Sequence, residues 1–110
     1  ALAVEEKTGV PLAPFLSIKE VLALVRRASL VVSGDTFALQ AACAFSVPVV
    51  GLFGPTNPRR NGPFLGRDKI VFCKLDCNPC YKTSCSTLDC LNKISSEEAA
   101  RAVREIWLGL

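Results

Sequence analysis

The stretch Leu30–Pro55, LVVSGDTFALQAACAFSVPVVGLFGP, decides the fold of this chain. It opens with an apolar run at Leu30–Val32 and closes with a second apolar run at Val47–Phe53. Between them a polar break at Ser33–Thr36 leads into an apolar segment of helical length. Strand, turn, helix and strand in this order make a βαβ unit, in which a crossover helix joins two parallel strands. Runs without polar alternation indicate strands that are covered on both faces.

The flanking sequence extends this unit in both directions. Ser17–Glu20 and Ser95–Glu98 have the pattern of capping boxes, in which a serine hydroxyl and a glutamate carboxylate satisfy free amides at a helix start. Apolar residues follow each box at helical spacing. We therefore predict an α/β fold, a Rossmann-like parallel sheet with flanking helices. The predicted strands are Leu30–Ser33, Val47–Phe53 and Lys69–Phe72, and the predicted helices are Ser17–Ala28, Thr36–Phe45 and Ser96–Leu108.

The turn Gly34-Asp35-Thr36 lies where the first strand gives way to a helix. One interpretation is an N-cap, in which Asp35 or Thr36 accepts a free amide and stabilises the helix by about 1 kcal/mol. The other is an anion site, because the free amides at a helix start, here those of Phe37, Ala38 and Leu39, attract phosphate. In the second case the Asp35 carboxylate is free to bind sugar hydroxyls.

A second loop, Gly54–Asn61, leaves the next strand at the same predicted edge of the sheet. Pro55 and Pro58 in this loop, and Pro63 just after it, are expected to prevent regular structure. Taken alone it indicates a solvated basic turn. If the loop lies beside the first one, both face the same cleft. The residues that would face it are Gly54, Thr56 with its hydroxyl and Arg59 with its guanidinium. Arginine pairs well with phosphate.

Five of the six cysteines gather in one segment, residues 73–92, which we predict to be an irregular loop. Two-residue spacing between cysteines suits a zinc knuckle, whereas disulfides would be unusual in a reducing cytosol. Spacing alone leaves zinc, disulfides and free thiols open. The metal or disulfide candidates are Cys77, Cys80, Cys85 and Cys90.

Composition narrows the function classes. The chain has 110 residues, of which 50% are hydrophobic, and a net charge of +3. Because the arginines are scattered, this charge does not indicate a nucleic-acid surface. The absence of histidine excludes histidine-based acid–base catalysis and histidine zinc ligands. The high apolar content predicts a face that another part of the protein should cover, and hence self-association of the chain alone.

Taken together, three motifs in order and spacing resemble glycosyltransferase family 9, the family of the ADP-heptose:lipopolysaccharide heptosyltransferases. The motifs are LVVSGDT at 30–36, VPVVGLFGPTNP at 47–58, and Cys77-Asn78-Pro79-Cys80 with Cys85, Cys90 and Leu91. The resemblance runs from about Ser17 to the end of the chain.

This resemblance implies a type-B glycosyltransferase with two Rossmann-like domains, of which residues 1–110 would be a partial C-terminal nucleotide-sugar-binding domain. The chain would bind a nucleotide-diphospho-sugar of the ADP-heptose kind, and a missing N-terminal domain would supply the acceptor site and a carboxylate base. The acceptor would be the lipopolysaccharide core. The resemblance implies a cytoplasmic protein, at the inner face of the bacterial inner membrane. The implied function requires no cofactor. Zinc remains a candidate only at the cysteine cluster.

Two positions depart from the family pattern, which usually has glycine and histidine where this chain has Phe37 and Gln40. A phenyl ring would narrow the approach of the backbone to phosphate, and glutamine keeps hydrogen bonding but cannot carry a proton. Two alternative functions therefore stay open. One is a nucleotide-sugar-binding module without catalysis, and the other is a small interaction domain stabilised by its cysteines.

Overall fold

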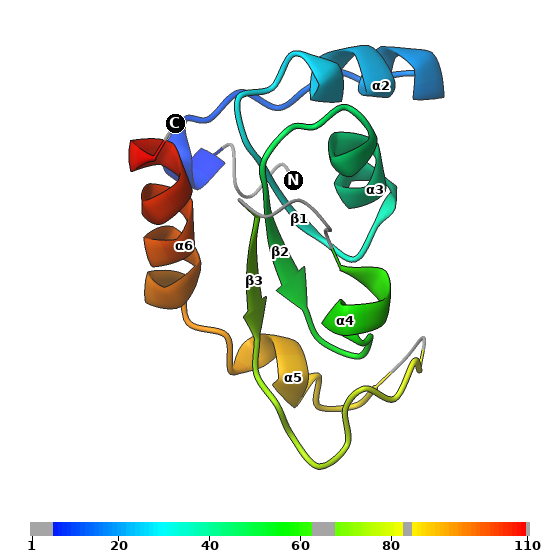
Figure 1. Ribbon diagram of the computed structural model, residues 1–110, viewed down its shortest axis with the longest axis vertical. Coiled ribbons are helices and arrows are strands. Elements are labelled where there is room, and N and C mark those ends of the chain that lie inside the picture. Colours follow the sequence, from blue (N-terminus) through cyan, green and yellow to red (C-terminus); the bar gives the residue numbers. More distant parts are fainter. Residues whose placement is uncertain (1–5, 63–67, 83–84, 110) are drawn as a thin grey trace.

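A three-stranded parallel sheet forms the centre of the computed structural model, which describes residues 6–62, 68–82 and 85–109. Its strands lie in the order β1 (Val31–Gly34), β2 (Val49–Phe53) and β3 (Lys69–Phe72) (Figure 1). Both pairings are parallel, with Val32 opposite Val50 and Gly51 opposite Ile70. The predicted α/β class is therefore confirmed.

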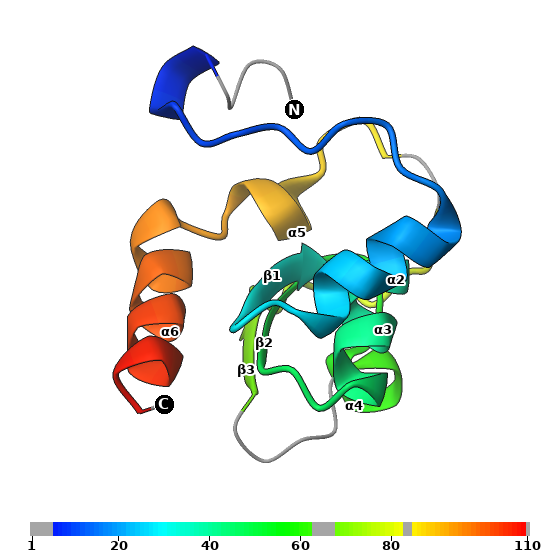
Figure 2. The ribbon, with the colours of Figure 1, turned by 90° about the horizontal axis from the view of Figure 1, so that it is seen from above.

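Helices cover both faces of the sheet. Seen from above, α6 lies on one side of the strands, whereas α2, α3 and α4 lie on the other (Figure 2). None of the helices in the described ranges is long and apolar enough to cross a membrane. The helices are α2 (Ile18–Arg26), α3 (Phe37–Ala44), α4 (Pro58–Asn61), α5 (Asp89–Asn92) and α6 (Ser96–Leu108).

The core explains why the central strand β2 has no polar residue at any position. Val49 and Phe53 are fully buried beneath α2 and α3 together with Leu39. Val50, which follows Val49 on the same strand, points to the opposite face and packs with Val71 and residues of α6. Successive side chains thus enter two cores on opposite faces, as expected for a parallel sheet covered on both sides.

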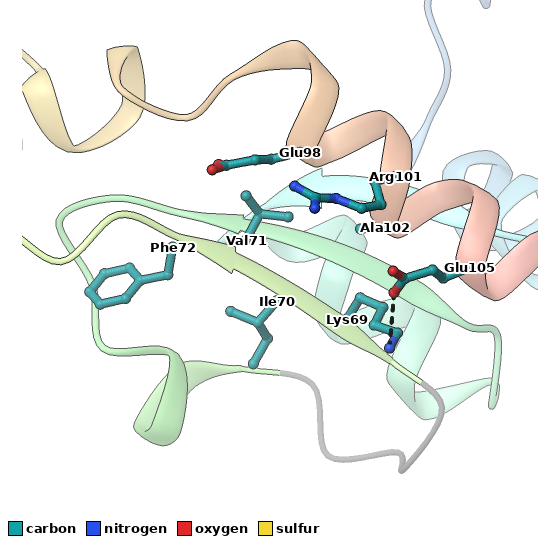
Figure 3. Close-up of a pocket in the computed structure, with 8 residues that line it drawn as sticks. All are labelled: Lys69, Ile70, Val71, Phe72, Glu98, Arg101, Ala102 and Glu105. Atoms are coloured by element: carbon teal, nitrogen blue, oxygen red, sulfur yellow. Dashed lines mark ion pairs between the residues drawn. The ribbon is translucent and has the colours of Figure 1, made fainter.

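The packing of α6 on β3 leaves a shallow polar hollow of about 290 Å³ (Figure 3). Val71 faces α6 here, while Lys69 pairs with Glu105 of α6 at 3.2 Å. Both partners are about half exposed, so the pair contributes little to stability, roughly 0–1 kcal/mol. The hollow lies on the α6 face of β3, whereas the two predicted ligand loops leave the carboxyl ends of β1 and β2.

The serine caps form as the sequence predicts. The Ser17 hydroxyl accepts the Glu20 amide at 3.3 Å, and the Glu20 carboxylate accepts the Ser17 amide at 3.0 Å. At α6 the Ser95 hydroxyl accepts the Glu98 amide at 3.1 Å, which is one half of the predicted box. The observed boundaries of β3 and α6 match the predicted ones, and those of the other predicted strands and helices differ by at most two residues.

Two predictions about loops are wrong in part. Pro58–Asn61 forms the short helix α4, because Asn57 caps it and proline is tolerated in the first helical turn. Asp89–Asn92 forms α5 within the segment predicted to be irregular, although its N-cap Leu88 lies in the left-handed region with φ 49°. Residues 83–84 of that segment lie outside the described residues.

Candidate functional site

The carboxyl ends of β1 and β2 lie side by side, as the sequence predicts. Gly34, the last residue of β1, is in register with Leu52 of β2. The turn at 34–36 and the Gly54–Asn61 loop therefore leave the sheet at the same edge, where α4 lies (Figure 1). This edge is where open parallel sheets bind ligands.

The start of α3 is not capped by its N-cap side chain. Thr36 occupies the N-cap position without a capping bond, and its hydroxyl instead lies 2.8 Å from the Ser33 hydroxyl. Its amide donates to the Gly34 carbonyl at 2.9 Å. The first amides of α3, starting at Phe37, thus keep their hydrogen-bonding capacity for another partner.

The side chains around the start of α3 differ in how exposed they are. Asp35 and Ala38 are partly buried, and Phe37 is 53% exposed. Leu39 is fully buried in the core, so only its backbone can face a ligand. Gln40 donates from its amide to the Asn61 carbonyl at 2.9 Å and thereby joins α3 to the end of α4.

The Gly54–Asn61 loop contains an unsatisfied hydroxyl. Thr56 Oγ1 is buried and has no hydrogen-bond partner in the described part of the chain. A buried hydroxyl without a partner costs free energy, and such groups are rare in folded proteins. Thr56 is the predicted site residue whose chemistry most clearly calls for a further partner.

The cationic side of the loop faces a pocket of about 370 Å³ between the loop and the end of β3. Arg59 and Lys74 are the cations that line it, together with Asn57, Pro58, Phe72 and Pro79. Asp35 and Thr36 do not belong to this lining. The structure therefore brings the two predicted loops to one edge, but the pocket lies on the β3 side of the Gly54–Asn61 loop.

Two residues that sequence reasoning missed hold this loop in place. Asn78, only 2% exposed, donates from Nδ2 to the carbonyls of Gly54 and Cys73 at 3.2 and 2.9 Å. The Tyr81 hydroxyl accepts the Asn57 amide at 3.0 Å and donates to Asn61 Oδ1 at 2.7 Å. Their position in or next to the cysteine motif was the one sequence signal that could have drawn attention to them. The spacing of that motif does not show that they contact the Gly54–Asn61 loop.

Comparison with known proteins identifies the family. The family model for glycosyltransferase family 9 (heptosyltransferase) matches residues 1–91, which include both loops of the candidate site. The chain belongs to glycosyltransferase family 9. Lipopolysaccharide heptosyltransferase 1 of Pseudomonas aeruginosa PAO1 is 35% identical over 74 residues, which cover 66% of this chain and 21% of that protein. The family 9 chain thus spans about a fifth of the relative's length. No solved structure matches this chain significantly.

The cysteine motif of this family 9 chain surrounds a second pocket, of about 270 Å³, at the base of the Gly54–Asn61 loop. Cys77, Cys80, Cys85 and Cys90 all line it, and none of the four forms a disulfide. Within residues 6–62, 68–82 and 85–109, no three cysteine, aspartate or glutamate side chains are grouped as metal ligands.

The four thiols differ in environment. Burial, and next the neighbouring Cys77 thiol, raise the pKa of the Cys90 thiol above its ordinary value. The exposed Cys85 sulfur accepts the Leu88 amide at 3.5 Å and lies 3.6 Å from Thr87 Oγ1. These contacts, with the Leu88 amide foremost, lower the pKa of the Cys85 thiol.

Proposed function

We propose that this family 9 chain is the donor-binding part of a glycosyltransferase that moves a heptose-like sugar from a nucleotide diphosphate to a lipopolysaccharide core acceptor. One observation carries the proposal: the family match spans the edge at which the turn at 34–36 and the Gly54–Asn61 loop meet. The similar protein from Pseudomonas is named a lipopolysaccharide heptosyltransferase, which supports the choice of sugar and acceptor.

The site would act by binding and orienting the donor. The amides at the start of α3 would bind the diphosphate, since a helix N-terminus carries partial positive charge. The Thr56 hydroxyl, which lacks a partner, would add a hydrogen bond, and the Arg59 guanidinium would add positive charge from the neighbouring pocket as charge develops on the leaving diphosphate. The Asp35 carboxylate repels phosphate but can accept hydrogen bonds from hydroxyl groups. It would therefore bind the sugar and not the diphosphate.

The remaining parts of the reaction would come from elsewhere in the protein. In this proposal a second, N-terminal Rossmann-like domain supplies the acceptor site and the carboxylate base across the cleft. The chain described here then binds donor without transferring sugar. The reaction would take place in the cytoplasm, at the inner face of the inner membrane.

A second candidate function, binding of a nucleotide sugar without transfer, is favoured by Gln40. Its amide is engaged with the Asn61 carbonyl, so it serves as a structural tether between α3 and α4. Turnover of donor by the full-length protein separates the two functions. Consumption of donor in the presence of acceptor supports transfer, and donor binding without consumption supports the second function.

The role of Asp35 is tested by titration calorimetry on the full-length protein. Asp35→Ala should weaken binding of the sugar donor by about 10-fold or more, in line with the loss of a hydrogen bond to a charged group. Binding of the bare nucleotide diphosphate should change much less, because it lacks the sugar hydroxyls. Asp76→Ala, which removes an exposed carboxylate of the cysteine segment, is the matched control and should leave both affinities unchanged. Equal losses for the two ligands would assign Asp35 a purely structural role at the start of α3.

A further inference from the structure

The pocket lined by four cysteines has no part in the proposed sugar transfer. Two separate stretches of chain contribute its thiols, Cys77 and Cys80 from the turn after β3, and Cys85 and Cys90 from the segment that includes α5. Lys82 and Asp89 are the charged side chains of the lining. The Leu88 amide, and to a smaller extent the Lys82 ammonium, lower the pKa of the Cys85 thiol in this lining.

Cys77 and Cys90 come from different stretches of chain, and both stretches contact the same residue, Gly54. Asn78, the neighbour of Cys77, donates to the Gly54 carbonyl at 3.2 Å. The Cys90 sulfur lies 3.1 Å from the position that a Cβ on Gly54 would occupy. The turn that carries Cys77 and the helix that carries Cys90 therefore meet at the start of the Gly54–Asn61 loop.

These two thiols have complementary exposure. Cys77 is exposed and can meet a reagent from solvent, whereas Cys90 is only 6% exposed. Cys90 is therefore shielded from bulky reagents in solution but shares the pocket with Cys77. An accessible thiol beside a second, resolving thiol is the arrangement of redox-sensitive cysteine pairs.

We propose that this pocket is an oxidative modification site, in which Cys77 and Cys90 form a reversible disulfide by reaction with a small-molecule disulfide. The Cys77 thiolate attacks one sulfur of the reagent, which forms a mixed disulfide and releases one thiolate. The Cys90 thiolate then attacks the Cys77 sulfur, which forms the protein disulfide and releases the second thiolate. Two electrons pass from the protein to the reagent, and the two protein protons end on the two released thiols.

A disulfide needs fewer side chains brought together than a metal site does. A structural zinc ion needs four ligands, and the described cysteine, aspartate and glutamate side chains provide no group of even three. A disulfide needs only two. In a reducing compartment such a bond would be transient and would report on redox conditions.

The bond would also act on the Gly54–Asn61 loop. The Cys90 sulfur and the Leu91 side chain pack against Gly54, and Asn78 holds the Gly54 carbonyl. Joining Cys77 to Cys90 would fix the turn and α5 to one another at that point. The thiol chemistry itself does not depend on the proposed sugar transfer, so its test reads the thiols directly.

The test is disulfide mapping of the full chain after incubation with mixtures of reduced and oxidised glutathione. Trypsin should release residues 75–82, with Cys77 and Cys80, and residues 83–93, with Cys85 and Cys90. The double variant Cys80→Ser/Cys85→Ser leaves one thiol in each peptide and makes the assignment unambiguous. We expect the two peptides to be joined, in the wild type and in this variant, and to separate on reduction.

Single variants supply the controls. Cys77→Ser and Cys90→Ser should each reduce the cross-linked peptide at least 10-fold, whereas Cys43→Ser in α3 should not change it. If a variant fails to fold, sequencing of the joined wild-type peptides by fragmentation identifies the bonded cysteines and decides the matter. A stable mixed disulfide with glutathione that is never resolved, a Cys77–Cys80 bond, or stoichiometric zinc that protects the thiols from alkylation would each overturn the proposal.

Discussion

Asn78 shows how a single buried side chain can join two parts of the chain. Its Oδ1 accepts the Leu75 amide at 2.6 Å, and its Nδ2 donates to the carbonyls of Cys73 and Gly54. The Lys74 ammonium also donates to its main-chain carbonyl. Buried backbone groups need such partners, and here one amide satisfies groups on both sides of the turn after β3.

Replacing Asn78 should therefore be costly. Asn78→Ala leaves the Gly54 and Cys73 carbonyls and the Leu75 amide without this partner, and we expect a loss of about 3 kcal/mol in the free energy of unfolding. Urea denaturation of the two proteins measures this difference.

Asn92→Ala is the matched control for that experiment. The Asn92 amide donates to the Thr87 carbonyl at 2.9 Å, but this bond is exposed and water can replace it. The expected loss is about 1 kcal/mol or less. Equal losses in the two variants would show that Asn78 does not carry the structural role described here.

At the scale of elements, the sequence was informative where local patterns set the structure. The βαβ unit and both helices that start at serine caps were predicted to within two residues, because capping and apolar spacing are local signals. Helix α4 was missed although Asn57 and Pro58 form a normal helix start, because the prolines were taken only as breakers. Helix α5 has no such signal, since Leu88 provides no side-chain cap.

The candidate site was predictable only in outline. The two loops could be placed at one sheet edge because parallel strands end on the same side. The contacts of Tyr81 and Asn78 with the Gly54–Asn61 loop join residues 20 or more positions apart, and such contacts leave no periodic pattern in a single sequence. The pairing of Gln40 with Asn61 was missed for the same reason.

The capping box of α2 predicts a dependence of stability on pH. Hydrogen bonds from Ser17 lower the pKa of Glu20 below the ordinary value of 4.5. The Glu20 carboxylate thus binds a proton less readily in the folded state than in the unfolded state. The stabilisation is present above about pH 4.5 and is lost as pH falls through the lowered pKa of the folded state.

Thermal unfolding tests this at pH 7 and pH 3. Glu20→Gln should lower the midpoint at pH 7, and the gap to the wild type should narrow at pH 3. Ser17→Ala removes the hydroxyl but keeps the main-chain amide that donates to the Glu20 carboxylate, so the difference between the pH 7 and pH 3 midpoints should shrink only in part. A gap that stays constant with pH in Glu20→Gln would contradict the assignment.

At the scale of the whole molecule, the sheet is covered unevenly. Helix α6 packs on β2 and β3, and Val32 of β1 is left 50% exposed. Large apolar side chains also stand in solvent at Phe15, Trp107 and Leu108. Strand β1 is an edge of the described sheet, so its free backbone groups can pair with another strand.

We therefore expect the chain to self-associate. Sedimentation at increasing concentration should show a mass that rises above 11.8 kDa. Val32→Lys, which places a charge on the β1 edge, should reduce this association, because inward or edge lysines oppose strand pairing. Surface substitution Lys19→Gln on α2 is the control. A strictly monomeric chain at high concentration, with one cooperative unfolding transition, would show that this exposed apolar surface needs no cover.

The bracing of the Gly54–Asn61 loop by Asn78 and Tyr81 also sets an order of events during synthesis. The ribosome releases β1, α3, β2 and the loop before the residues that fix the loop's shape. Sheet formation can begin early, because its strand pairs need only sequence up to Phe72. The shape of the loop is complete only when the cysteine segment has emerged and folded back. A nascent chain stalled after β3 would thus have its strands but an unfinished loop.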